Sequence, residues 1–209
     1  LKMPMDQDMV LRPRDLLLAH REVLSQCGGR EKGLRVVEIA NKFPRVEAVL
    51  ASIKEKYEYV GKTFSIVVPE KIEQIIEEGQ ALKHCLDRSD RYFERIANQE
   101  SYIVFLRRTK AMEQPYYTLE IEPDGTTRQK RTVGDNQNND YHRAEKFLKK
   151  WQAAIRPRLS QEDFERQEIS RQLRMYELES LRNDKVTVHG GIHAGELLAD
   201  ILEADLMEA

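Results

Sequence analysis

Three consecutive segments near the middle of the chain limit its fold more than any other feature. Residues 101–107, 115–122 and 126–129 have the apolar, aromatic or alternating character of strands, and Asp124-Gly125 is a strong turn signal between the last two. Because the connections between the segments are short, neighbouring strands are expected to pair antiparallel. The chain should therefore contain an antiparallel meander.

The remainder of the chain is expected to be mainly helical, divided by proline, glycine and capping residues. The expected elements are, in order, a helix that begins at Pro13, a helical stretch over 34–57 that Pro44 interrupts, strands at 57–60 and 63–68, and helices over 70–83, 90–97, 141–155, 161–182 and 196–207. Helices gathered around an antiparallel sheet are typical of the α+β class. We therefore predict an α+β fold with three to five antiparallel strands, flanking helices and a long charged helix near the C-terminal end.

The length and composition suit one core with helical extensions. The chain has 209 residues, which we divide into an N-terminal helical region (1–56), an α+β core (57–156) and a helical C-terminal extension (157–209). No apolar run approaches the ~20 residues that cross a bilayer, and the first residues have no signal-peptide pattern. With two cysteines only, Cys27 and Cys85, we predict a cytoplasmic protein with free thiols and no membrane partner.

Opposite charges are segregated in the C-terminal half of the chain. Residues 128–158 hold nine Lys and Arg against three Asp and Glu, whereas residues 160–209 hold five against twelve. Such blocks indicate an internal electrostatic contact or a basic face with an acidic tail, although two solvated helix faces give the same pattern. We take 128–158 as the candidate contact for a nucleic acid or nucleotide. Helix 161–182 is the candidate contact for a protein partner or self-association.

His84 and Cys85 stand together at the end of the helix expected over 70–83. Successive helical positions are about 100° apart, so the two side chains do not easily point at one atom. Cysteine is among the most buried residue types, so Cys85 is assigned to the core. His84 is then directed toward the polar side of the strands, as an acid, base, phosphate contact or ligand. A Cys85 nucleophile activated by His142 is the unsupported alternative.

Strand alternation places Glu120 on the face opposite the apolar residues of its own strand. Arg107 or Tyr102 on the preceding strand can share that face. So can Gln129 or Arg128 on the following strand, depending on the register. Solvated cross-strand pairs would explain the same polar residues without any function.

From these positions we name four candidate catalytic residues: His84, Arg107, Glu120 and Gln129. His189 and His193 have the i, i+4 spacing of a helical metal site, but Gly190-Gly191 argues against a helix there. A zinc site also needs three or four ligands. We assign no metal site and no cofactor.

Several of these motifs lie in an order that is similar to one known family. The matching residues are Glu78, Gly79, Leu82, His84 and Cys85 on the helix (with Leu86 where the family has valine), the run from Ile103 to Arg107, then Thr118, Glu120, Ile121, Gln129, Gly134 and Asn136 or Asn138. Over roughly residues 13–156 the chain thus resembles the PcfJ-like proteins, which are carried by conjugative plasmids and other mobile elements. The four residues between Gln129 and Gly134 depart from the family's closer spacing, which leaves the loop alignment open.

The resemblance implies a protein of a mobile genetic element and specifies no reaction. Our first hypothesis is an enzyme that acts on nucleic acid or a nucleotide through a cleft formed by His84, Arg107, Glu120 and Gln129. A variant is an ADP-ribosyltransferase-like site that uses His84, Tyr102 and Glu120. The alternative is a non-catalytic nucleic-acid- or protein-binding module in plasmid transfer or phage biology. Convergence of His84 and Glu120 on a concave pocket would favour the enzyme.

Overall fold

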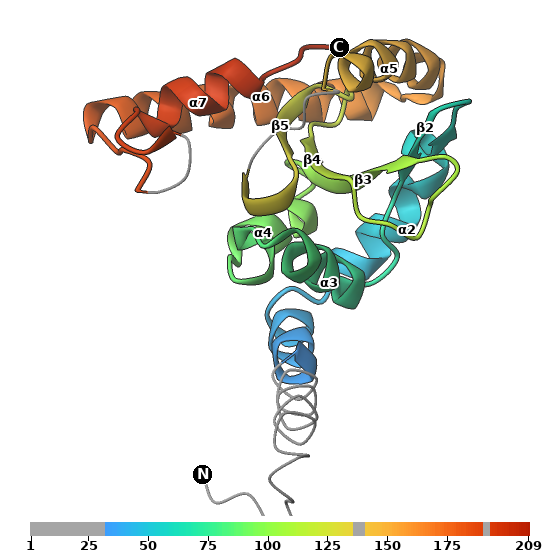
Figure 1. The fold of residues 1–209 in the computed structure, drawn as a ribbon, viewed down its shortest axis with the longest axis horizontal. Coiled ribbons are helices and arrows are strands. Elements are labelled where there is room, and N and C mark those ends of the chain that lie inside the picture. Colours follow the sequence, from blue (N-terminus) through green and yellow to red (C-terminus); the bar gives the residue numbers. More distant parts are fainter. Residues whose placement is uncertain (1–31, 136–140, 190–192) are drawn as a thin grey trace, which may run out of the picture.

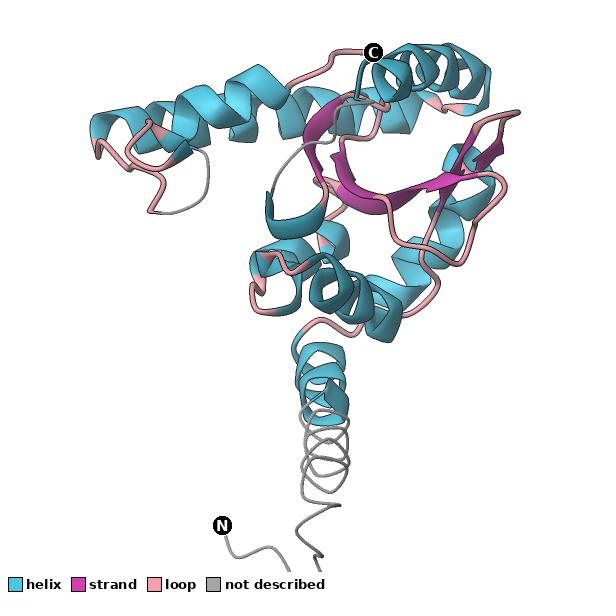
Figure 2. Ribbon diagram, in the orientation of Figure 1, coloured by secondary structure: helices cyan, strands magenta, loops and turns pink. Residues whose placement is uncertain are grey.

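The computed structural model describes residues 32–135, 141–189 and 193–209, which form an open antiparallel sheet with helices on both sides (Figure 1, Figure 2). The strands are β1 (Tyr59–Val60), β2 (Phe64–Val67), β3 (Tyr102–Arg108), β4 (Tyr117–Ile121) and β5 (Thr127–Arg131). They lie in sequence order, each antiparallel to the next. The predicted α+β class and the meander are confirmed, and the sheet has five strands.

The helices follow the predicted order closely. They are a helix over 32–42, α2 (Val46–Tyr57), α3 (Ile72–Leu82), α4 (Arg91–Ala97), α5 (Tyr141–Ile155), α6 (Gln161–Asn183) and α7 (Leu198–Asp205), with single 3₁₀ turns η1 (Cys85–Asp87), η2 (Val133–Asp135) and η3 (Arg156–Arg158). Pro44 separates the first two helices as expected, because its ring blocks a continuous helix. The helix expected from Pro13 lies outside the described residues, as do Cys27, Asn136 and Asn138.

The turn between β4 and β5 explains why Asp124-Gly125 is such a strong signal. The backbone N–H of Thr126 donates to Asp124 Oδ1 at 2.8 Å, and Gly125 has φ +92°. A β-carbon at Gly125 would lie only 2.7 Å from Ile155 Cδ1 of α5. Glycine is therefore required both by the backbone conformation and by the close packing of α5 on this turn.

Both faces of the sheet are covered. On one face Val104 and Leu119 are fully buried, and α5 packs there through Trp151. On the other face Ile103 and Phe105 are also buried, on the side of α3, η1 and α4. Figures 1 and 2 show the sheet between α5 on one side and α3 and α4 on the other. Polar side chains on the Glu120 face are therefore enclosed by protein rather than solvated.

The chain leaves the helical path directly before His84 and Cys85. Helix α3 ends at Leu82, Lys83 adopts the left-handed conformation (φ 55°), and His84 is extended. As a result His84 is 8% exposed, whereas Cys85 is exposed at the surface. The assignment of Cys85 to the core was wrong, because helical spacing does not continue past Leu82. The orientation of His84 toward the strands is confirmed.

The core combines residues from much of the described chain. Ile39 and Met207, from the first and third regions of our sequence-based division, are both buried in the main hydrophobic cluster. The three-region division itself stays a prediction. In the described ranges no helix is both long enough and apolar enough to cross a bilayer.

Candidate functional site

A pocket opens on the Glu120 face of the sheet, between β4, β5, the η1 turn and α4. The empty space in it, counted together with adjoining open solvent, is about 300 Å³. Its polar lining consists of His84, Cys85, Tyr92, Thr118, Glu120, Gln129 and Arg131. Three of the four predicted catalytic residues therefore meet in one cavity.

Strand register brings these side chains together. Glu120 of β4 pairs with Gln129 of β5, and Thr118 pairs with Arg131, so all four point to the same face. His84 reaches this face from the end of α3, and its Nε2 lies 3.0 Å from Thr118 Oγ1. Arg131 was not among the candidate catalytic residues, although strand alternation puts it on the same face as Gln129, two residues away.

Arg107 lies on the same face but in a different place. It is four residues along β3 from Ile103, the partner of Glu120, which is roughly 13 Å at strand spacing. Its guanidinium donates two hydrogen bonds to Glu78 of α3, at 2.8 and 2.5 Å, in a separate groove that Phe105 also lines. The structure therefore does not bring Arg107 to the pocket with the other three candidates.

Tyr102 is on the opposite face of the sheet. It pairs with Ile121, and its ring centroid is 5.6 Å from that of Tyr57 in the core. Burial raises the pKa of Tyr102 to about 12. The ADP-ribosyltransferase-like set of His84, Tyr102 and Glu120 is therefore not formed, because alternate strand residues point away from each other.

Glu120 is a buried carboxylate with one oxygen satisfied and one not. Its Oε1 accepts hydrogen bonds from Arg95 Nη1 at 2.8 Å and Ser101 Oγ at 2.6 Å, and Arg128 Nη1 lies 3.6 Å away. Its Oε2 is buried and accepts no hydrogen bond from any residue in the described ranges. Burial acts to raise the pKa of Glu120, but the charges of Arg95 and Arg128 outweigh it and hold the pKa below its usual range. Glu120 is therefore ionised at neutral pH.

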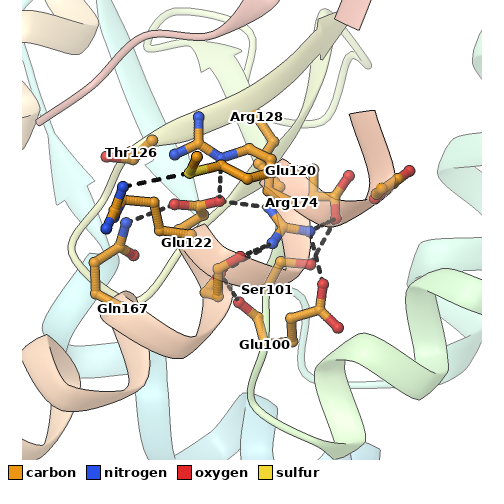
Figure 3. Close-up of polar contacts among 12 residues, drawn as sticks. Glu100, Ser101, Glu120, Glu122, Thr126, Arg128, Gln167 and Arg174 are labelled. Carbon is orange, nitrogen blue, oxygen red and sulfur yellow. Dashed lines mark hydrogen bonds and ion pairs between the residues drawn. The ribbon is translucent and has the colours of Figure 1, made fainter. Parts of the chain in front are cut away.

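Helix α6 contributes to the charge network that holds these arginines in place (Figure 3). Arg95 forms an ion pair with Glu177, and Arg128 Nη2 donates to the Ser170 carbonyl oxygen at 2.8 Å. Glu122, beside Arg128, receives a further contact from Arg174, whose Nε lies 3.0 Å from Glu122 Oε1. Buried ions are tolerated only when they are paired in this way, so α6 is part of the surroundings of Glu120.

The inward face of α6 is consequently polar. The buried residues of this helix are Asp163, Ser170, Arg174 and Leu178. Its apolar residues Ile169, Leu173 and Tyr176 are instead exposed, by 60%, 46% and 74%. A helix that packs on a protein core ordinarily buries its apolar residues. Helix α6 buries polar residues instead, because the β4–β5 hairpin presents the charged side chains of Glu122 and Arg128 to it.

Cys85 and Tyr92 border the pocket, with Cys85 Sγ 3.7 Å from the Tyr92 hydroxyl. Burial, followed by the nearby charge of Glu120, raises the pKa of Tyr92 well above its usual range, so its hydroxyl stays protonated. His142 is on α5, across the sheet from the pocket, where it lies 3.5 Å from Glu145. A Cys85–His142 pair is therefore not formed.

The histidine pair near the C-terminal end makes no cluster of ligands. His193 Nδ1 lies 3.2 Å from Glu196, and across the part of the chain that the structure describes no group of three or more His, Cys, Asp and Glu could hold a metal ion. The pocket offers a carboxylate, an imidazole, an amide and a guanidinium, with the Cys85 thiol and the Tyr92 hydroxyl at its border. Such groups suit general acid–base chemistry and the binding of polar ligands.

Comparison with known proteins gives two matches. The family model described as PcfJ-like protein matches residues 1–146, a range that includes the pocket residues but ends before α6. An uncharacterized protein of Listeria innocua, Lin1253/Lin1744, is 21% identical over 156 residues, which are 75% of this chain and 32% of that protein. The chain thus spans about a third of the length of this curated relative. No solved structure matches the chain.

Proposed function

The chain belongs to the PcfJ-like protein family, and we propose that it is an enzyme that acts on a nucleotide or nucleic acid in the pocket of His84, Glu120 and Gln129. The observation that carries this proposal is the unpartnered Oε2 of Glu120. A buried acceptor without a partner costs about 1–3 kcal/mol, and more when it is charged. A ligand O–H or N–H group that enters the pocket would recover this loss.

The pocket residues divide into complementary roles. Glu120, ionised and held by Arg95, is the proton acceptor for a ligand O–H or N–H. His84, anchored on Thr118, supplies a ring nitrogen that can donate or accept a proton. Gln129 and Arg131 present an amide and a guanidinium, which suit the acceptor atoms of a base or phosphate. The catalytic assignment therefore moves from Arg107 to Arg131 for the positive charge.

The biological setting is part of the same proposal. The family resemblance supports a role in a mobile genetic element, and the chain's composition supports a cytoplasmic location. Basic residues of 128–158 are the proposed contact for the nucleic acid or nucleotide.

The test is binding of a panel of mononucleotides, followed by isothermal calorimetry, to the wild type and two variants. Glu120→Gln removes the acceptor charge, and Gln129→Leu changes the pocket wall without touching the Arg95–Glu120 pair. Glu113→Gln, in the separate groove of Arg107, is the control. Loss of at least tenfold in affinity for both pocket variants, with the control unchanged, supports the proposal. Equal binding by folded wild type and both pocket variants would refute it.

A second candidate function is a binding module that assembles through α6. The exposed residues Ile169, Leu173 and Tyr176 recur every three or four positions and so lie along one side of this helix. A second copy of the chain could cover this stripe. Size-exclusion chromatography with light scattering should then show a dimer that Tyr176→Ser converts to monomer, while Met175→Ser, elsewhere on the helix, does not. A concentration-independent monomer would exclude this candidate.

A further inference from the structure

Helix α5 has a one-sided distribution of charge. Its inward residues are Ala144, Leu148, Trp151 and Ile155, all buried in the core. Its outward side carries four exposed cations, Arg143, Lys146, Lys149 and Lys150, which we call the α5 basic face. These residues are three or four positions apart or adjacent, so they form one continuous surface.

The cations of the α5 basic face have no partners among the residues that the structure describes. None of the four makes a hydrogen bond or ion pair within the residues that the structure describes. Lys42 and Lys54, by contrast, pair with Asp90 and Glu70. The single acid of α5, Glu145, faces Lys130 and His142 instead. The basic face is therefore an uncompensated positive surface.

The structure divides the basic segment 128–158 into two parts. Arg128 and Lys130 of β5 are buried and paired with acids, as Arg131 is with Asp205 of α7. This part is the internal electrostatic contact that the charge pattern allowed. Arg131 also lines the pocket, and the α5 cations remain exposed at the surface.

The basic face and the pocket lie on opposite sides of the sheet. Gln129, which lines the pocket, pairs with Glu120, whereas its neighbour Lys130 pairs with Leu119 and points the other way. Lys130 lies 3.8 Å from Glu145 of α5. A group bound at the α5 basic face therefore cannot be the group bound in the pocket.

We propose that the α5 basic face binds the phosphate backbone of a nucleic-acid polymer. The four cations lie within eight residues, 143–150, roughly 10 Å along the helix axis, over which duplex DNA carries about six phosphate charges. A membrane surface fits less well, because an interfacial helix must insert an apolar face and α5 buries its apolar face in the core. The inference deepens the proposed function, by making its substrate a polymer, but the surface itself does not depend on the pocket.

The test measures fluorescence anisotropy of short labelled single-stranded and duplex oligonucleotides over a range of salt concentrations. The variant is Lys146→Gln/Lys149→Gln/Lys150→Gln. The matched control, Lys32→Gln/Lys42→Gln/Lys54→Gln, removes the same charge from lysines that already have partners. Each phosphate contact contributes about −0.9 to the slope of the logarithm of the binding constant against the logarithm of the salt concentration. The slope for duplex should therefore change from about −3.6 with four cations to about −0.9 in the α5 variant, which keeps Arg143 alone.

Each outcome decides the inference. Loss of oligonucleotide affinity in the α5 variant alone supports it, and equal affinity in the α5 and control variants overturns it. Binding to vesicles of anionic phospholipid without binding to oligonucleotides also overturns it, in favour of a membrane surface. If mononucleotides fail to bind the pocket while oligonucleotide binding still depends on α5, the proposed function fails and this inference stands.

Discussion

Arg107 was a candidate catalytic residue, but in the structure it forms a buried ion pair with Glu78, and this structural role can be tested directly. Arg107 is 7% exposed and Glu78 is 3% exposed, and two hydrogen bonds of 2.8 and 2.5 Å join them. Arg107→Met would leave the Glu78 carboxylate buried without its partner. Breaking a buried pair in this way costs about 3–5 kcal/mol.

The double variant Glu78→Leu/Arg107→Met should recover most of that loss. Replacement of a whole buried ion pair by apolar residues of similar volume is often neutral or stabilising. What remains lost is the contact of the Arg107 guanidinium with the Phe105 ring, 4.7 Å from its centroid, worth about 0.5–2 kcal/mol. We therefore expect the double variant to lie within about 2 kcal/mol of the wild type.

Urea denaturation followed by circular dichroism gives the four free energies of unfolding for this cycle. Arg171 and Glu168, an exposed pair on α6 with 2.8 Å between Nη2 and Oε1, provide the control cycle, expected to give about 0.2–1 kcal/mol. A loss below about 1 kcal/mol for Arg107→Met would contradict the reasoning. So would a folded double variant with weakened nucleotide binding, because Arg107 would then serve the pocket.

Three further predictions concern backbone strain, acid stability and thiol exposure. Gly125→Ala should lower the free energy of unfolding, measured by thermal denaturation, by at least about 1–3 kcal/mol. Gly195 has a similar φ of +89° but open space around it, so Gly195→Ala should lower the free energy of unfolding by less. Equal losses would contradict the close contact between Gly125 and Ile155. The pKa of Glu120 is lower in the folded state, so its stabilisation is present above the unfolded value of about 4.3 and is lost as pH falls through the folded pKa. Denaturation at several pH values should show a steeper acid loss in wild type than in a Glu120→Gln variant. Cys85 should react with a thiol reagent in the folded protein, as located by mass spectrometry, and a protected Cys85 would contradict its exposure.

The buried charges around Glu120 have a consequence for engineering of the C-terminal region. Glu177 forms an ion pair with both Arg91 and Arg95, and Arg128 depends on Ser170. Removal of α6 would therefore leave guanidinium groups beside Glu120 without their partners. A fragment that ends with the family match at residue 146 would lack these contacts.

Local pattern in the sequence was sufficient for much of the fold. Turn signals, Pro44 and the capping sequence at Ser160 defined elements that the structure contains, because turns and helix ends depend on residues close together in the chain. Strand alternation also placed Glu120 correctly on the face away from the core residues of β4, since a period of two is a property of the strand itself.

Local pattern failed where the backbone leaves a regular element. The left-handed Lys83 turned Cys85 out to the surface, contrary to its assignment to the core, and left His84 directed toward the strands as predicted. Local pattern also did not decide whether the apolar residues Ile169, Leu173 and Tyr176 of α6 would face the core or the outside; in the structure they are exposed. The orientation of a helix depends on whether the neighbouring elements offer it an apolar or a charged surface. The sequence of the helix alone does not contain that information.

What the sequence determined by itself was the order of elements, the meander, and the face of β4 to which Glu120 belongs. The register of the folded sheet then selected Arg107 over Tyr102, and Gln129 over Arg128, for that face. What only the tertiary structure decided was which charges meet. Arg107 forms an ion pair with Glu78, and Arg95 forms one with Glu120. The cations of the basic segment 128–158 are divided between buried ion pairs and the exposed surface of α5. The physical reason is that strand register and helix docking set distances between residues far apart in the chain, and ion pairs depend on those distances.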